Sequence, residues 1–157
     1  MNREIVASNM QLLAAPFIPK DKQVEAVYST LKQKDTLCLL PTGYGKTLIF
    51  QVLPALCKRL SEKLPSYHAP NKPLVIVVSP LIALMNSQIQ SINGEHKIDG
   101  TLASKVEDFK WKNRGDVNIV IGSPESWLSR SCLDKISKYI AKDVIAIVVI
   151  EAHALKW

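Results

Sequence analysis

The chain has 157 residues, of which 47% are hydrophobic and 22% are charged, and its formal net charge is +6. This length and composition are typical of one globular domain with a sizeable hydrophobic core. No run of about 18 uncharged apolar residues is present, and the first residues do not have the layout of a signal peptide, so we expect no membrane partner.

The first half of the chain predicts two helices, a strand and a third helix. Apolar spacing favours helices over residues 4–14 and from Asp21 onward. The apolar run over residues 36–40 predicts a buried strand. A helix then follows a glycine-rich turn and continues toward residue 64, and we expect it to break at Pro54, which lies inside it.

The second half alternates between apolar runs and amphipathic segments. The pattern predicts strands over residues 74–78, 117–121 and 144–150, and helices over residues 81–91, 104–112 and 133–140. Ser104 and Glu107 have the spacing of a capping box at the start of one of these helices. Residues 97–102 fit either a short strand or a loop.

Alternation of apolar strands with helices indicates an α/β fold, with a mostly parallel sheet flanked by helices on both faces. Ligands of such sheets bind at the carboxyl ends of the strands. The segments 41–47, 79–80, 123–125 and 151–153 all follow predicted strands. We therefore expect them to meet at one edge of the sheet.

The stretch Pro41-Thr42-Gly43-Tyr44-Gly45-Lys46-Thr47 has the pattern of a phosphate-binding loop. Small residues let backbone N–H groups surround phosphate oxygens, and the following helix adds the positive end of its dipole. Lys46 is expected to reach the β- and γ-phosphates, and the Thr47 hydroxyl to ligate Mg²⁺. Leu40 stands where the strict pattern has glycine, and the alternative is a surface turn that contains a lysine.

Four motifs in order make the chain similar to a known family. After the glycine loop come Val-Val-Ser-Pro-Leu-Ile-Ala-Leu-Met at residues 77–85, Ser-Pro-Glu at 123–125 and Glu-Ala-His at 151–153. This series resembles the superfamily 2 helicases, and the wording of the second motif resembles the RecQ-like DNA helicases. The resemblance covers residues 16–157, and it implies an N-terminal helix (1–15) followed by a RecA-like ATP-binding lobe.

The resemblance also implies roles for individual residues. The nucleotide ATP would be held with Mg²⁺ by a set from the loop and from the segment before it: Lys20, Gln23, Thr42, Gly43, Tyr44, Gly45, Lys46 and Thr47. Lys20 and Gln23 would select adenine, Glu151 would act as the general base, and His153 would couple the nucleotide site to DNA. Single-stranded or partly duplex DNA would be contacted by the segments of Ser79, Pro80, Gln88 and Ser123.

The chain departs from the family pattern near its end. Ile150 stands where the family has an aspartate that holds Mg²⁺, and Ile offers no oxygen. The chain stops at Trp157, so we expect the second helicase lobe to be missing. A lobe of this kind should retain ATP binding but be weak or inactive as a motor by itself.

Two other functions remain open from the sequence. One is a non-catalytic fragment that binds nucleotides and single-stranded nucleic acid, which Ile150 favours. The other is a small P-loop phosphotransferase, which should carry an arginine-rich lid that this sequence lacks.

Composition also bears on location and on secondary contacts. Cys38, Cys57 and Cys132 lack zinc-site spacing, which is typical of reduced cysteines in an intracellular protein, nuclear or cytoplasmic. The family favours the nucleus if the source is eukaryotic. The basic cluster at residues 110–114, which includes Trp111, fits either a solvated helix end or a nucleic-acid contact.

Overall fold

The computed structural model describes residues 1–150 of the chain. The helices are α1 (Arg3–Ala14), α2 (Asp21–Leu31), α3 (Lys46–Gln51), α4 (Leu53–Lys63), α5 (Ile82–Gln90), α6 (Pro124–Leu128) and α7 (Arg130–Lys135). The strands are β1 (Leu74–Val78), β2 (Ala103–Lys105), β3 (Ile119–Gly122) and β4 (Val144–Val149). No helix among these residues is long and apolar enough to cross a membrane.

The strands form one parallel sheet in the order β2-β3-β1-β4. Each connection therefore crosses over the sheet, and the carboxyl ends of all four strands lie at the same edge. Val78 pairs with Gly122 on one side and with Val149 on the other. The α/β class and the parallel sheet expected from the alternating pattern are confirmed.

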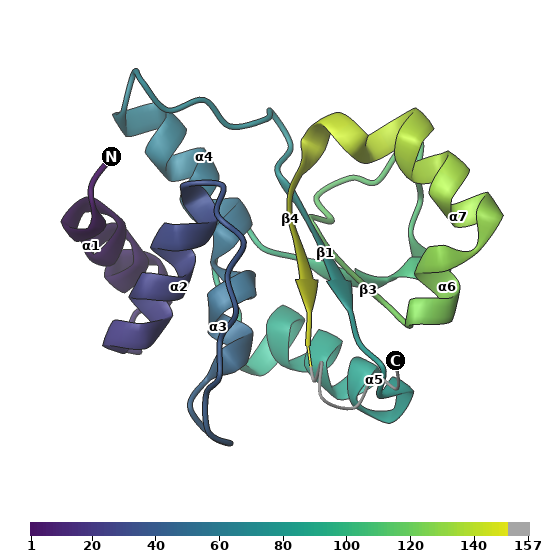
Figure 1. Ribbon diagram of the computed structural model, residues 1–157, viewed down its shortest axis with the longest axis horizontal. Coiled ribbons are helices and arrows are strands. Elements are labelled where there is room, and N and C mark those ends of the chain that lie inside the picture. Colours follow the sequence, from purple (N-terminus) through teal and green to yellow (C-terminus); the bar gives the residue numbers. More distant parts are fainter. Residues whose placement is uncertain (151–157) are drawn as a thin grey trace.

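Helices cover both faces of the sheet. Figure 1 shows α1 to α4 on one side of the strands, α6 and α7 on the other, and α5 below the strand ends. The larger core packs α1 to α5 against one face and contains Leu56, Leu60 and Phe50, each at most 2% exposed. The smaller core packs α6 and α7 against the opposite face around Trp127. Each fully buried leucine contributes roughly 2 kcal/mol of hydrophobic free energy.

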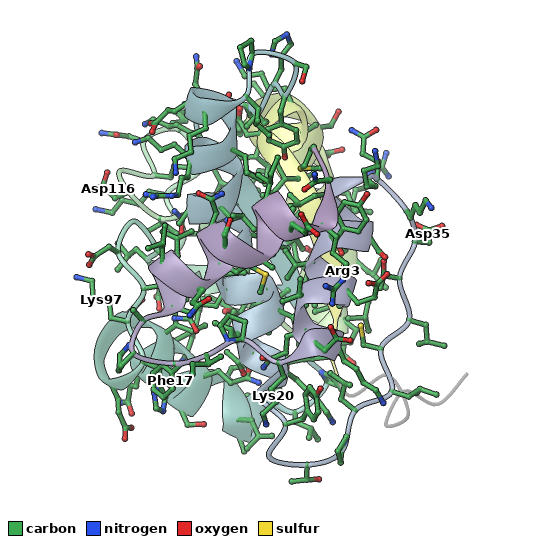
Figure 2. The ribbon with its side chains drawn as sticks, turned by 90° about the vertical axis from the view of Figure 1, so that its left-hand side faces the viewer. Arg3, Phe17, Lys20, Asp35, Lys97 and Asp116 are labelled. Carbon is green, nitrogen blue, oxygen red and sulfur yellow. The ribbon has the colours of Figure 1, made fainter. Side chains whose placement is uncertain are left out.

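Side-chain caps and ion pairs fix where the helices begin. The side chain of Asn2 accepts a hydrogen bond from the Ile5 amide at the start of α1. The Arg3 guanidinium then pairs with Asp21 and Glu25 of α2 and joins these helices (Figure 2). The predicted break at Pro54 is confirmed, because α3 ends at Gln51 and α4 starts with Pro54 in its first turn.

The strand predicted over residues 36–40 is wrong. This segment is an extended loop outside the sheet, and Leu37 and Leu39 are 82% and 83% exposed. Figure 2 shows Asp35, just before it, at the outer margin of the molecule. An apolar run favours a strand only where it meets a pleated surface, and here a cavity lies between the segment and β4.

The helix predicted over residues 104–112 is also wrong. Ser104 lies in β2, and only Val106–Asp108 forms a short 3-10 turn. The Ser104 hydroxyl donates to the Lys105 carbonyl, while Glu107 accepts from the Ser126 hydroxyl of α6. Glu107 is thus used in a contact between distant segments, which the local capping pattern could not reveal.

Arg114 does not belong to an exposed basic cluster. It is 8% exposed and donates to the Lys72 carbonyl at 2.6 Å and to Asp143 at 3.1 Å. These contacts join the segments that lead into β1, β3 and β4. Trp111 packs edge-on against Phe109 and Trp127. The predicted cluster is therefore divided: Arg114 is buried and joins three segments, whereas Lys110 and Lys112 are exposed to solvent.

Candidate nucleotide-binding site

The glycine-rich loop turns sharply between the segment at residues 36–40 and α3. Gly43 and Gly45 have φ angles of +80° and +90°, a region that glycine adopts without steric cost. The Tyr44 amide donates to the Pro41 carbonyl, which closes the turn. Helix α3 begins at Lys46, so the first amides of the helix face the loop without intrahelical acceptors.

Gln23 braces this loop from α2. Its Nε2 donates to the carbonyls of Tyr44 at 3.1 Å and Gly45 at 2.8 Å, and its Oε1 accepts from the Lys20 amide. The Lys20 ammonium also donates to the Tyr44 carbonyl and lies 4.4 Å from the centre of the Tyr44 ring. Figure 2 shows Lys20 directly above the loop. The structure therefore brings both residues predicted to select adenine to the loop.

A cavity of about 1060 Å³ lies beside the loop. Its wall on the far side is β4, and its polar end is the glycine loop. The residues that line this end come from the loop, from α5 and from the end of β4, and they are Gly43, Gly45, Lys46, Thr47, Gln88 and Ile150. The volume accommodates a nucleotide, and Lys46 and Thr47 are among the residues that line it.

The residues predicted to contact DNA lie at the carboxyl ends of β1 and β3 and on α5. Ser79 is 1% exposed and Ser123 is 6% exposed. The Ser123 hydroxyl caps α6 by accepting from the Ser126 amide at 3.1 Å. Pro80 is half-buried at the start of the loop to α5. As in the prediction, the structure places these residues at the same edge of the sheet as the glycine loop.

The acidic motif falls at the limit of the described residues. Glu151 and His153 lie outside them. Ile150 belongs to the described residues. Its amide donates a hydrogen bond to the Val78 carbonyl, which continues the pairing of β4 with β1, and its side chain packs at the margin of the larger core. Position 150 thus lines the cavity and carries a hydrocarbon side chain.

The donor set of the described residues suits a magnesium ion held together with a nucleotide. Residues 1–150 contain no cluster of three His, Cys, Asp or Glu side chains that could hold a metal ion by itself. Mg²⁺ prefers oxygen ligands and keeps several waters, and in P-loop sites phosphate oxygens supply most of the rest. Thr47 lines the cavity, and its hydroxyl is the protein oxygen that fits this role.

Sequence reasoning missed two features of the site. The first is that the Gln23 amide is engaged by the loop backbone, which only the packing of α2 beside α3 determines. The second is the Trp127 indole, whose Nε1 donates to the Val77 carbonyl at 3.0 Å. A Cβ added to Gly122 would lie only 2.7 Å from this Nε1, so the indole requires glycine there. A glycine at the end of an apolar strand was the available signal for this close approach.

The parallel sheet, the glycine loop that opens α3 and the cavity between this loop and β4 together define a RecA-like P-loop lobe. Comparison with known families agrees, because residues 20–156 match the DEAD/DEAH box helicase model. The chain belongs to the DEAD/DEAH box helicase family.

The relatives found by sequence comparison are RecQ-type helicases, as the motif series predicts. The chain is 34% identical over 144 residues to the ATP-dependent helicase SGS1 of Saccharomyces cerevisiae, covering 87% of this chain and 9% of that protein. It is 32% identical over 139 residues to the ATP-dependent DNA helicase RecQ of Synechocystis, covering 85% of this chain and 26% of that protein. The probable ATP-dependent DNA helicase RecS of Bacillus subtilis is 29% identical over 141 residues, which cover 87% of this chain and 25% of RecS.

Proposed function

We propose that this chain is the ATP-binding lobe of a RecQ-like DNA helicase, and that it binds ATP with Mg²⁺ at residues 41–47. The observation that carries the proposal is the glycine loop, braced by Gln23, at the border of a cavity of about 1060 Å³. The names of the relatives support both ATP as the nucleotide and DNA as the nucleic acid.

In this proposal the backbone amides, Lys46 and Thr47 make different contacts with the nucleotide and its metal ion. The backbone amides at the start of α3 hold phosphate oxygens, and the positive end of the helix dipole adds to this attraction. The Lys46 ammonium neutralises charge on the β- and γ-phosphates. The Thr47 hydroxyl is the protein ligand for Mg²⁺, which supplies charge neutralisation at the phosphates when bound.

Adenine selection by Lys20 and Gln23 requires a change at the loop. The Gln23 amide already uses its oxygen and both hydrogens, so its Nε2 must leave a loop carbonyl before it can donate to a base. Adenine recognition is then linked to the shape of the loop that holds the phosphates.

Hydrolysis is expected to be weak in this chain. Glu151 is the proposed general base for the attacking water, and His153 is the proposed link to DNA. The Ile150 side chain provides no oxygen for the hydrated metal ion, which removes an electrostatic contribution to the transition state of about several kcal/mol.

DNA contact is proposed for the loop that follows β1, which starts at Ser79-Pro80, and for the start of α6, which Ser123 caps after β3. Both serine side chains are buried, so the backbone of these segments and their exposed neighbours form the contact surface. Such contacts are made with the sugar-phosphate backbone, independent of sequence, and weaken as salt rises.

Nucleotide binding is tested by isothermal titration of the chain with ATP and Mg²⁺, with Lys46→Ala as the comparison. Loss of the ammonium should weaken binding at least about tenfold, because a hydrogen bond to a charged group is worth roughly 1.5–3 kcal/mol. Lys58→Ala, on the exposed side of α4, is the matched control and should bind as the wild type does. Equal heats from the wild type and Lys46→Ala would overturn the proposal.

A second function, a non-catalytic fragment that binds nucleotide and single-stranded nucleic acid, is favoured specifically by Ile150. Phosphate release in the presence and absence of single-stranded DNA separates the two. DNA-stimulated release supports the catalytic lobe, whereas nucleotide binding without release supports the fragment.

A further inference from the structure

Two buried oxygen atoms near the carboxyl edge of the sheet have no hydrogen-bond partner among residues 1–150. They are Oγ of Ser79 and Oε1 of Gln88. Leaving a buried polar atom unpaired costs roughly 1–3 kcal/mol, so native proteins retain such atoms rarely. Gln88 lines the cavity, and Ser79 follows Val78, which receives the hydrogen bond of the lining residue Ile150. Unpaired oxygens at and next to a ligand cavity indicate groups that are satisfied when the ligand is present.

The Ser79 side chain points to the nucleotide side of the sheet. Side chains alternate along a strand, and Val75 and Val77 of β1 pack into the larger core, so Ser79 continues that face. The pairing of Val78 with Val149 places Ser79 beside Ile150, whose side chain also packs against this core. Ser79 is 1% exposed, and its hydroxyl is thus a polar group next to Ile150, whose side chain has no oxygen.

Gln88 reaches the same place from α5. Met85, Ile89 and Ile92 pack into the larger core, and Gln88 lies between them in sequence, three residues after Met85. This spacing turns Gln88 inward from the solvent. Gln88 lines the cavity together with Lys46, Thr47 and Ile150, and its Oε1 is buried.

We propose that Ser79 and Gln88 position water molecules of the hydrated Mg²⁺ ion beside Ile150. This inference rests on the proposed nucleotide binding and assigns both residues to the nucleotide site rather than to the DNA surface that the motifs suggest. They are positioning residues, because they act through water.

The chemistry of the two oxygens selects this ligand. The Gln88 oxygen is only an acceptor, so it repels phosphate oxygens and needs a hydrogen donor between itself and the triphosphate. Mg²⁺ gives up its waters reluctantly, and a metal-bound water is a strong donor. The Ser79 hydroxyl both donates and accepts, so it can complete the hydrogen bonds of the same waters, at a position where Ile150 contributes none.

The test measures the affinity of a fluorescent, non-hydrolysable ATP analogue, once with excess Mg²⁺ and once with EDTA. Gln88→Leu should weaken binding about tenfold with Mg²⁺ and leave binding in EDTA unchanged, since the lost bond is to metal-bound water. Ser79→Ala should weaken binding about threefold in the same selective way. Gln90→Leu, exposed on the same helix, is the matched control and should change neither value.

Two further measurements distinguish this role from a structural one. Ser79→Ala removes an unpaired buried hydroxyl, so the variant should melt no lower than the wild type even though its Mg²⁺-dependent affinity falls. Ile150→Asp supplies an acceptor beside the Ser79 hydroxyl, so Mg²⁺-dependent affinity should rise. The effect of Ser79→Ala should then be larger in the Ile150→Asp background than alone.

Each outcome has one meaning. If the wild type fails to bind the analogue under either condition, the proposed nucleotide binding fails. If the wild type binds but Gln88→Leu weakens binding equally with Mg²⁺ and EDTA, or not at all, this inference alone is wrong. If Gln88→Leu instead lowers only the affinity for single-stranded DNA, measured by fluorescence anisotropy, Gln88 belongs to the DNA surface and the inference is overturned.

Discussion

Gln23 illustrates how one side chain can serve two purposes. An amide at this position is suited to read adenine, yet here its hydrogens hold the carbonyls of Tyr44 and Gly45. The side chain is 3% exposed, so its position is fixed by packing as well as by hydrogen bonds. The amide can donate to a base only if its Nε2 leaves one of the loop carbonyls, which links the two ends of the nucleotide.

The two glycines of the loop allow the bracing role of Gln23 to be measured. A Cβ on Gly45 would lie 2.7 Å from the Gln23 Nε2, whereas a Cβ on Gly43 would meet nothing within 4 Å. Gly43→Ala should therefore cost only backbone strain, about 1–2 kcal/mol. Gly45→Ala should cost about 1–2 kcal/mol more, because the two hydrogen bonds from the amide are also displaced.

Urea unfolding of both variants measures this difference. Gln23→Ala provides the control, since it should reduce the extra cost of Gly45→Ala when the two are combined. Equal costs for the two glycine variants would mean that Gln23 does not brace the loop.

At the scale of elements, the sheet is held at its amino end by one buried ion pair. The side chains of Arg114 and Asp143 are 6% and 17% exposed, and burial lowers the pKa of the Arg114 guanidinium while Asp143 opposes this shift. Arg114 also bonds to the Lys72 carbonyl, so the segments entering three strands share one side chain.

Removing one partner of this pair should cost more than removing both. Asp143→Leu leaves a buried guanidinium without its counter-charge and should destabilise the fold by about 3 kcal/mol. The double variant Arg114→Met/Asp143→Leu should recover part of that loss, because no unpaired charge remains. Urea unfolding checks this, and a double variant no more stable than Asp143→Leu would contradict it.

The elements also show where local patterns suffice. The continuous apolar runs at β1, β3 and β4 predicted strands correctly because each run pairs with a neighbouring strand and packs at least one face against the larger core. Residues 36–40 carry the same pattern but lie outside the sheet, with a cavity toward β4. Similarly, Ser104 and Glu107 have the spacing of a helix start. Ser104 instead belongs to β2, and Glu107 accepts a hydrogen bond from Ser126 of α6.

At the scale of the whole molecule, one group of exposed apolar side chains lies along β4 and the segment at residues 36–40. Ile147 and Val149 are 67% and 46% exposed, and Leu37 and Leu39 of the facing segment are more exposed still. An open sheet edge with apolar neighbours is a surface on which another strand can pair. The free edge of β4 also lines the proposed nucleotide cavity, so pairing of another strand with this edge would change the shape of the cavity.

Leucine substitutions test this distribution of exposed and buried surface. Leu37→Ala and Leu39→Ala should each change the free energy of unfolding by less than about 0.5 kcal/mol, as exposed substitutions do. Leu56→Ala, at a fully buried position, should cost about 2–5 kcal/mol. If the exposed pair costs as much as Leu56→Ala in urea unfolding, residues 36–40 are packed as the strand that their sequence predicts.

The sequence by itself determined the alternation of helices and strands, the glycine loop and the order of the motifs, because each depends on residues close together in the chain. It also determined that position 150 lacks an oxygen. Only the tertiary structure decided that Gln23 holds the loop, that Arg114 is buried, and that the oxygens of Ser79 and Gln88 are unpaired near Ile150. These features depend on which distant segments meet, and local spacing carries no information about that.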